Sequence, residues 1–208
     1  MSKLRANLTI TLDGFTAGPN QREEAPFGDG VDKLHDWMFA AMQDREDGKT
    51  GIDVDFLRRS EENLGATIMG RNMFGPVRGP WQNEDWKGWW GENPPYHHPV
   101  FVLTHHLRPD LPMDGGTTFH FTDAPIEEVL KRAFEVADGK DVQIGGGAAT
   151  VQQYLRAGLI DELHLVIAPL VVGDGERLLD NIGTGIQGYE VTEVVSSPAV
   201  THAILTKR

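Results

Sequence analysis

Short apolar runs alternate along the chain with segments in which apolar residues recur every three or four positions. Runs of the first kind predict β-strands, and the second spacing predicts amphipathic helices. The predicted strands are residues 4–11, 66–70, 99–104, 117–121, 142–144 and 163–168. The predicted helices are residues 31–41, 53–64, 126–134 and 148–157. Because strands and helices alternate through most of the chain, the pattern predicts an α/β protein with a largely parallel sheet.

Two further apolar segments close the chain, residues 189–196 and 200–206, on either side of the turn sequence SSPA. They predict an antiparallel pair, so the sheet should be mixed. Gly65 is expected to end the second helix and Gly158 the fourth, since glycine commonly follows the last helical turn. No repeat or linker divides the sequence, and we expect a single domain over residues 1–208.

Charge and composition narrow the range of functions. The 208 residues carry a formal net charge of −12, which argues against a nucleic-acid or anionic-membrane partner. A phosphorylated ligand would therefore need local cations or backbone N–H groups. The chain has no cysteine, which excludes disulfides and thiol catalysis. The N-terminal sequence has no apolar run typical of a signal peptide or membrane span, and we expect a cytoplasmic protein.

A glycine-rich turn, Gly145 to Gly147, joins a predicted strand to a predicted helix. Glycines let the backbone approach a pyrophosphate, and a helix N-terminus offers free N–H groups to an anion. The match to G-x-G-x-x-G is incomplete, because Thr150 stands where the last glycine belongs, and the turn comes late in the chain. An ordinary Rossmann domain is therefore disfavoured. Two alternatives remain here: a dinucleotide site in another fold, or a turn without a ligand.

Polar residues also follow two other predicted strands. Arg71 comes after the strand ATIMG, and Thr104, His105 and His106 come at the end of the strand PVFVLT. Open α/β sheets bind ligands at the carboxyl ends of their strands, where the fork of an arginine suits a phosphate. Alternatively, Arg71 pairs with a carboxylate and the histidines are simply exposed. The histidine spacing matches no metal-binding motif, so no metal site is expected.

Acidic residues and tryptophans supply candidates for the substrate side. Asp13, in the turn sequence LDGFTAG, either stabilises that turn or serves as a proton source. Asp32, His35 and Asp36 lie on the first predicted helix and are further candidates. Four of the five tryptophans fall within WQNEDWKGWW, residues 81–90. This segment is expected to fold back on the core or into a dimer contact, or else to form a wall beside a flat substrate.

Taken in order, these motifs resemble the dihydrofolate reductase-like superfamily. The motifs are TxxLDGF, a strand ending in MGR, PVFVLTH, GGG before a helix, and AGLIDELHLVIAPLVVGDGERL. Within the superfamily the chain is most similar to the reductase domain of bifunctional riboflavin-biosynthesis enzymes and to its stand-alone bacterial relatives. The resemblance implies a three-layer α/β fold: a mixed, mostly parallel sheet with helices on both faces and a C-terminal antiparallel hairpin.

The resemblance also implies a cofactor, NADPH, with its pyrophosphate at the late glycines. It further implies a cis peptide bond between Gly145 and Gly146, and a 2′-phosphate near Thr104 and His105. The full set of implied cofactor-binding residues is Thr9, Thr16, Ala17, Gly70, Arg71, Asn72, Thr104, His105, Ile144, Gly145, Gly146, Gly147, Ala148, Thr150 and Val151. Asp13 and Asp36 are the catalytic candidates.

We therefore expect an NADPH-dependent reductase that transfers a hydride to a small heterocyclic substrate, similar to 5-amino-6-(5-phosphoribosylamino)uracil reductase. The riboflavin-pathway reductases tend to carry Glu-Gly-Gly where this chain has three glycines, so that carboxylate is absent here. Two alternatives are dihydrofolate reduction and, in another class, an NADPH-binding protein without turnover. Because relatives often pair, a homodimer is expected.

Overall fold

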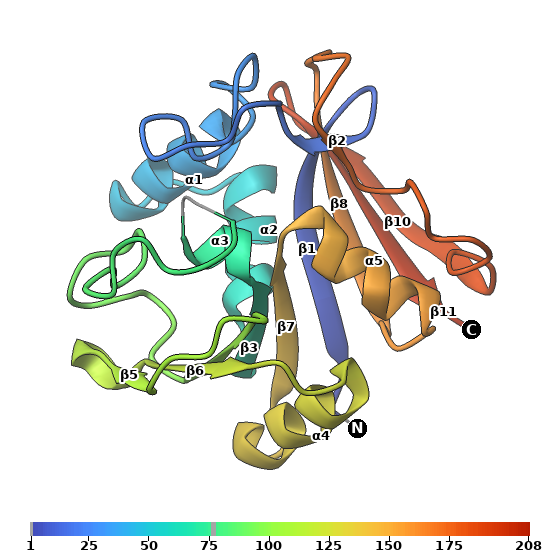
Figure 1. The fold of residues 1–208 in the computed structure, drawn as a ribbon. Helices are drawn as coiled ribbons and strands as arrows, with labels where there is room; N and C mark the ends of the chain where they lie inside the picture. Colours follow the sequence, from blue (N-terminus) through green and yellow to red (C-terminus); the bar gives the residue numbers. More distant parts are fainter. Residues whose placement is uncertain (1, 76–77) are drawn as a thin grey trace.

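The computed structural model describes residues 2–75 and 78–208, which form a nine-stranded sheet with helices on both faces (Figure 1). The strand order is β10-β11-β8-β1-β7-β3-β4-β6-β5. The bounds are β1 Leu4–Thr11, β3 Leu64–Gly70, β4 Pro99–Leu103, β5 Leu111–Pro112, β6 Thr118–Thr122, β7 Asp141–Gly146, β8 Glu162–Ala168, β10 Tyr189–Ser196 and β11 Thr201–Lys207. A separate small sheet pairs β2, Phe15–Ala17, with β9, Glu176–Arg177.

The sheet is mostly parallel. Strands β8, β1, β7, β3, β4 and β6 all pair in parallel, whereas β11, β10 and β5 are antiparallel to their neighbours. The last two long strands form the expected C-terminal hairpin, and β11 attaches it to β8. This topology confirms the predicted fold class.

Two layers of helices cover the sheet because its strands are apolar on both faces. The bounds are α1 Asp36–Glu46, α2 Ile52–Glu61, α3 Arg71–Phe74, α4 Ile126–Ala137, α5 Ala148–Arg156 and the 3-10 turn η1 Asp114–Gly116. Alternate residues of β1, from Leu4 to Ile10, pack in one core with α4 and α5. The opposite face of β8 packs against Leu34 and Trp37 at the start of α1. No helix in the described part of the chain is long and apolar enough to cross a membrane.

The tryptophan-rich segment covers the β3–β4–β6 part of the sheet. Trp81, Trp86 and Trp90 pack against a buried cluster that includes Phe74 and Phe119. Two of the indoles also donate to backbone carbonyls, Trp86 Nε1 to Phe74 O at 2.8 Å and Trp81 Nε1 to His106 O at 2.7 Å. The segment therefore follows the expectation of a loop folded back on the core.

Some predicted boundaries are wrong. Gly65 does not end the second helix, because α2 stops at Glu61 and Gly65 lies inside β3. A Cβ on Gly65 would come within 2.4 Å of the Ala137 carbonyl oxygen, so this glycine allows the end of α4 to approach the strand. The first helix begins at Asp36, later than the predicted residue 31, because residues 32–35 form turns. Gly158 does follow the end of α5, with a φ of 64°.

Candidate nucleotide-binding site

The carboxyl ends of the parallel strands bring the predicted cofactor residues together. Strand β3 pairs with β4 up to Gly70 and Leu103, and with β7 up to Met69 and Gly146. Arg71, Thr104 and Gly147 therefore follow three neighbouring strands at one edge of the sheet. These residues lie far apart in sequence, and only the parallel topology makes them neighbours.

The glycine turn leads directly from β7 into α5. The cis peptide bond lies between Gly146 and Gly147, one position later than predicted, because β7 continues through Gly145 and Gly146 before the chain turns. Gly146 has a φ of 129°, which strongly favours glycine. A Cβ on Gly147 would meet no atom within 4 Å, so this residue borders open space. Within the described residues no side chain caps the α5 N-terminus, which leaves N–H groups available to an anion.

Gly70 brings the end of β3 close to α5. A Cβ on Gly70 would lie 2.4 Å from the Thr150 hydroxyl oxygen, so a larger residue would push strand and helix apart. Thr150 and Val151 are themselves buried in the first turns of α5, and Ile144 and Ala148 are buried beside them. These four residues shape the turn from within; they do not offer side-chain atoms to a ligand.

Arg71 begins α3 directly after β3, and its guanidinium is half-buried. Its Cζ lies 3.4 Å from the centre of the Trp81 ring. Its Nε and Nη1 atoms are shielded from solvent and have no hydrogen-bond partner among the described residues. Burial, followed by the nearby charge of Arg108, lowers the pKa of Arg71 to about 10. Buried donors without partners are rare, so this arginine lacks a counterpart that an anion would provide.

Three other predicted cofactor residues, Thr104, His105 and Asn72, follow strands β4 and β3 at the same edge of the sheet. Thr104 is buried, and its hydroxyl accepts from the His106 N–H at 3.0 Å, whereas His105 is exposed. The Asn72 side chain faces Arg78, and its oxygen can accept from Arg78 Nε at 2.7 Å. The turn after β4 is thus fixed by Thr104, and His105 is the residue that it exposes.

Near β1, the predicted cofactor residues are buried or hydrogen-bonded to other parts of the protein. Thr9 is buried, and its hydroxyl accepts a 3.0 Å hydrogen bond from Trp37 Nε1, an interaction that sequence reasoning missed. Thr16 donates to the Glu176 carbonyl in the β2–β9 pair, and Ala17 is buried there. The side-chain hydroxyls of both threonines are therefore already engaged, so contacts to a ligand would come from backbone and methyl groups.

Asp13 ties two loops together. Its carboxylate accepts from the Thr11 hydroxyl at 2.6 Å and from the Gly173 N–H at 2.7 Å, with longer bonds from the Val172 N–H. These bonds, that of Thr11 first, hold the pKa of Asp13 below its ordinary value. A carboxylate that is ionised and accepts these hydrogen bonds fits the role of stabilising the turn better than the role of a proton source. Asp36 is exposed in the first turn of α1.

Asp32 and His35, the other candidates on the first predicted helix, do not form an acidic cluster at the carboxyl edge of the sheet. Asp32 is exposed, whereas the His35 ring packs against Phe27 with ring centres 4.2 Å apart. Burial lowers the pKa of His35 to about 4, so this ring is neutral near neutral pH. Among the described residues no cluster of three His, Asp or Glu side chains could hold a metal.

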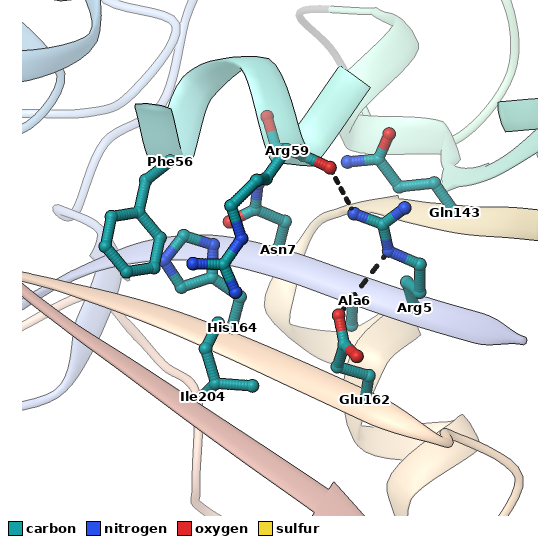
Figure 2. A pocket seen from close by; sticks show the side chains of 10 residues that line it. Arg5, Ala6, Asn7, Phe56, Arg59, Gln143, Glu162, His164 and Ile204 are labelled. Atoms are coloured by element: carbon teal, nitrogen blue, oxygen red, sulfur yellow. Dashed lines mark hydrogen bonds and ion pairs between the residues drawn. The ribbon is translucent and has the colours of Figure 1, made fainter. Parts of the chain in front are cut away.

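A small cavity of about 30 Å³ lies elsewhere, between α2 and the amino-terminal ends of the central strands (Figure 2). Its two arginines are paired: Arg5 lies 3.6 Å from Glu162, and Arg59 bonds to Glu193 at 2.8 Å. Its volume suits about one water molecule. The cavity therefore lacks both the size and the free charge for a nucleotide.

Beside this cavity runs a buried hydrogen-bonded chain that the sequence did not reveal. His164 Nε2 lies 3.0 Å from His202 Nδ1, and His202 Nε2 lies 2.9 Å from Asp53 Oδ1. Phe56 stacks on the His202 ring at 4.0 Å. Burial is the main cause that lowers the pKa of both histidines, that of His164 to about 3. This hydrogen-bonded chain joins α2 to β8 and β11.

Comparison with known proteins agrees with this architecture. A riboflavin biosynthesis protein from Shewanella sp. PV-4 superposes with a TM-score of 0.64 at 20% identity, over 99% of both chains. Dihydrofolate reductase from Enterococcus faecalis, complexed with NADP(H), gives 0.52 at 15% identity, over 99% of this chain and 96% of that one. The bifunctional deaminase/reductase of Thermotoga maritima gives 0.58 at 12% identity; the match covers all of this chain and 57% of that protein.

Sequence comparison is more specific than these structural likenesses. The uncharacterized protein YyaP of Bacillus subtilis (strain 168) is 28% identical over 184 residues, which is 85% of this chain and 79% of that protein. The model of the RibD C-terminal domain matches residues 2–196, almost the whole sequence. The chain therefore belongs to the RibD C-terminal domain family.

Proposed function

We propose that the protein is an NADPH-dependent reductase acting on a small heterocyclic substrate. The observation that carries the proposal is Arg71: two buried donors without partners in residues 2–75 and 78–208, at the carboxyl edge of the sheet, next to a glycine turn. In a chain with a net charge of −12, an arginine with this environment calls for an anionic ligand. Membership of the RibD C-terminal domain family and the likeness to an NADP(H)-bound reductase support a nicotinamide dinucleotide as that ligand.

The residues present fit such a cofactor. Gly146, Gly147 and the N-terminus of α5 would hold the pyrophosphate, because this turn borders open space and has free N–H groups. Arg71, with Thr104 and His105, would hold the 2′-phosphate. Bound NADPH supplies the hydride; the protein orients it and keeps water away.

The two acidic candidates are proposed for different roles. Asp13 is proposed as a positioning residue, since its carboxylate fixes the loop after β1 against residues 172–173. Asp36, which is exposed at the start of α1, keeps the role of candidate proton source. Because a general acid must be able to hold a proton near neutral pH, the lowered pKa of Asp13 counts against it.

The substrate should differ from that of the riboflavin-pathway reductases. Gly145 stands where those reductases tend to carry glutamate. A Cβ on Gly145 would lie 3.1 Å from Met73 Cε and 3.2 Å from Met73 Sδ, so Met73 occupies the space beside it. A glutamate here would require Met73 to move. The pairing of Gly145 with Met73 replaces a carboxylate by an apolar contact, which favours a less polar heterocycle.

The test of the proposal is the binding of NADPH and NADH to the native protein and to Arg71→Ala. We expect the variant to lose about 1–3 kcal/mol of NADPH binding, the range for a charged hydrogen-bonding partner, and little NADH binding. Arg132→Ala is the matched control, because Arg132 is exposed on α4 and packs over Phe101. Equal weakening of both dinucleotides would show that Arg71 does not recognise the 2′-phosphate.

A further inference from the structure

Two arginines stand apart from the other charges of this acidic protein. Most of the arginines in ion pairs are at the surface, and the pairs join carboxylates to Arg5, Arg22, Arg45, Arg58, Arg59, Arg78 and Arg208. Arg71 and Arg108 are partly buried, and neither has a carboxylate within ion-pair distance in the described ranges 2–75 and 78–208; Glu84 and Asp85 attract Arg108 only from farther away. In a chain with 31 acidic residues, two partly buried cations without a direct ion pair form an arrangement that an external anion would stabilise.

Both cations lie against the same indole. The Arg71 Cζ is 3.4 Å and the Arg108 Cζ is 4.9 Å from the centre of the Trp81 ring. The two charges are therefore closer together than the Debye length of about 10 Å at moderate salt, and they repel each other. The cation–π contacts with Trp81 offset part of that repulsion. An anion between or beside the two guanidinium groups would offset the rest.

Arg108 is held in place by the tryptophan-rich segment. Its Nη1 donates to the Trp86 carbonyl at 2.8 Å, and its Nη2 donates to the Glu84 carbonyl at 2.6 Å. An arginine has five N–H groups, so three remain for other partners. Neutral carbonyls fix the orientation of the guanidinium, and the carboxylates of Glu84 and Asp85 attract it without a direct ion pair. This is how a preorganised anion-binding group would be supported.

The two arginines also share the edge of the sheet where the nucleotide is expected. Arg71 follows β3, and Arg108 lies in the loop that follows β4, four residues after Thr104. The Trp81 N–H donates to the His106 carbonyl in that same loop, which ties the indole to the chain after β4. Sequence motifs gave no indication of Arg108.

We propose that Arg108 is a second phosphate-binding residue, which together with Arg71 recognises one dianionic phosphate group beside the Trp81 ring that both guanidinium groups contact. The proposal rests on the proposed function, in which that group is the 2′-phosphate of NADPH. Two cations match the two charges of a phosphate monoester, and a second arginine adds selectivity over a 2′-hydroxyl. The competing explanation is that Arg108 only supports the loop through its two carbonyl bonds.

Adenosine 2′,5′-bisphosphate and AMP distinguish these explanations, because they differ only in the 2′-phosphate. We expect the native protein to prefer the bisphosphate in a calorimetric titration. Arg108→Gln should reduce that preference by at least about tenfold, the lower end of the effect of a charged hydrogen bond, and leave AMP binding unchanged. Arg132→Gln is the control and should keep the full preference. Thermal unfolding of each variant checks that it is folded.

Arg108→Lys provides a second test if the glutamine variant does not fold. Lysine keeps the positive charge, and this variant should keep part of the preference for the bisphosphate. The proposal is overturned if Arg108→Gln keeps the full preference, if it weakens both nucleotides equally, or if Arg108→Lys abolishes the preference. A native protein whose preference depends on Arg71 but not on Arg108 would overturn this inference and leave the proposed function intact. A native protein that binds neither nucleotide would overturn both.

Discussion

The contact between Gly70 and Thr150 gives a sharp steric prediction for the junction of β3 and α5. Gly70 has a φ of −82° and a ψ of 159°, an extended conformation that any residue adopts, so its backbone does not require glycine. An added Cβ would nevertheless lie 2.4 Å from Thr150 Oγ1, although it would be 3.6 Å from Thr150 Cβ. An alanine at position 70 would therefore clash only with the outer part of the Thr150 side chain.

Gly70→Ala should destabilise the protein because Thr150 is buried and cannot rotate freely. Overpacking of this kind costs about 1–3 kcal/mol, offset in part by about 0.4–1 kcal/mol from the stiffer unfolded chain. Replacing Thr150 by alanine removes the clashing atom and leaves an ordinary contact. The two substitutions should therefore couple favourably by about 1–2 kcal/mol, within the range seen for residues in contact.

Urea unfolding of the native protein, both single variants and the double variant measures this coupling. Thr150→Val is the matched control, because valine keeps a group in the position of the hydroxyl and should not rescue Gly70→Ala. Additive effects of Gly70→Ala and Thr150→Ala would refute the steric reasoning, as would equal rescue by valine.

Three further predictions concern polar side chains that hydrogen bonds hold within the fold. The pKa of His164 lies at about 3 in the folded protein, below the ordinary 6.5. Between these two values the unfolded chain binds a proton that the folded chain does not. The free energy of unfolding should therefore fall as pH is lowered from 6.5 to about 3. In His164→Gln, the slope of unfolding free energy against pH should flatten by up to about 1.4 kcal/mol per pH unit, and an unchanged slope would contradict this. Asp13→Asn should lower the Tm at neutral pH, and the difference from the native protein should vanish as pH falls through the lowered pKa of Asp13; a difference that persists in acid would argue against the ionised carboxylate. Trp37→Phe should cost about 1–3 kcal/mol in urea unfolding, because it leaves the buried Thr9 hydroxyl without its donor, whereas a neutral effect would mean that Thr9 finds another partner.

The sequence predicted the sheet well because its buried strands are strongly apolar. The pairing of parallel strands then explains why Arg71, Thr104 and the late glycines meet at one edge. Short elements were missed: β5, β2 and β9 have two or three residues, too few for a periodic pattern. Gly65 was misplaced because a glycine after a helical segment can equally lie where another element approaches closely.

Side-chain partners were the least predictable part of the site. The stacking of Arg71 and Arg108 on Trp81 depends on how a long irregular loop folds, and no local spacing encodes it. Asp53, His164 and His202 form their buried chain from three separate elements for the same reason. The dual possibility for Asp13 was visible in the sequence, but its hydrogen bonds with residues 172–173 were not.

The most direct test of the account is a calorimetric titration of the native protein with NADPH and NADH under identical salt conditions. The account predicts saturable binding of NADPH and clearly weaker binding of NADH, because only NADPH presents a 2′-phosphate to Arg71. Absence of binding by either dinucleotide would contradict the account, and would leave the turn from Gly145 to Gly147 as a structural feature alone.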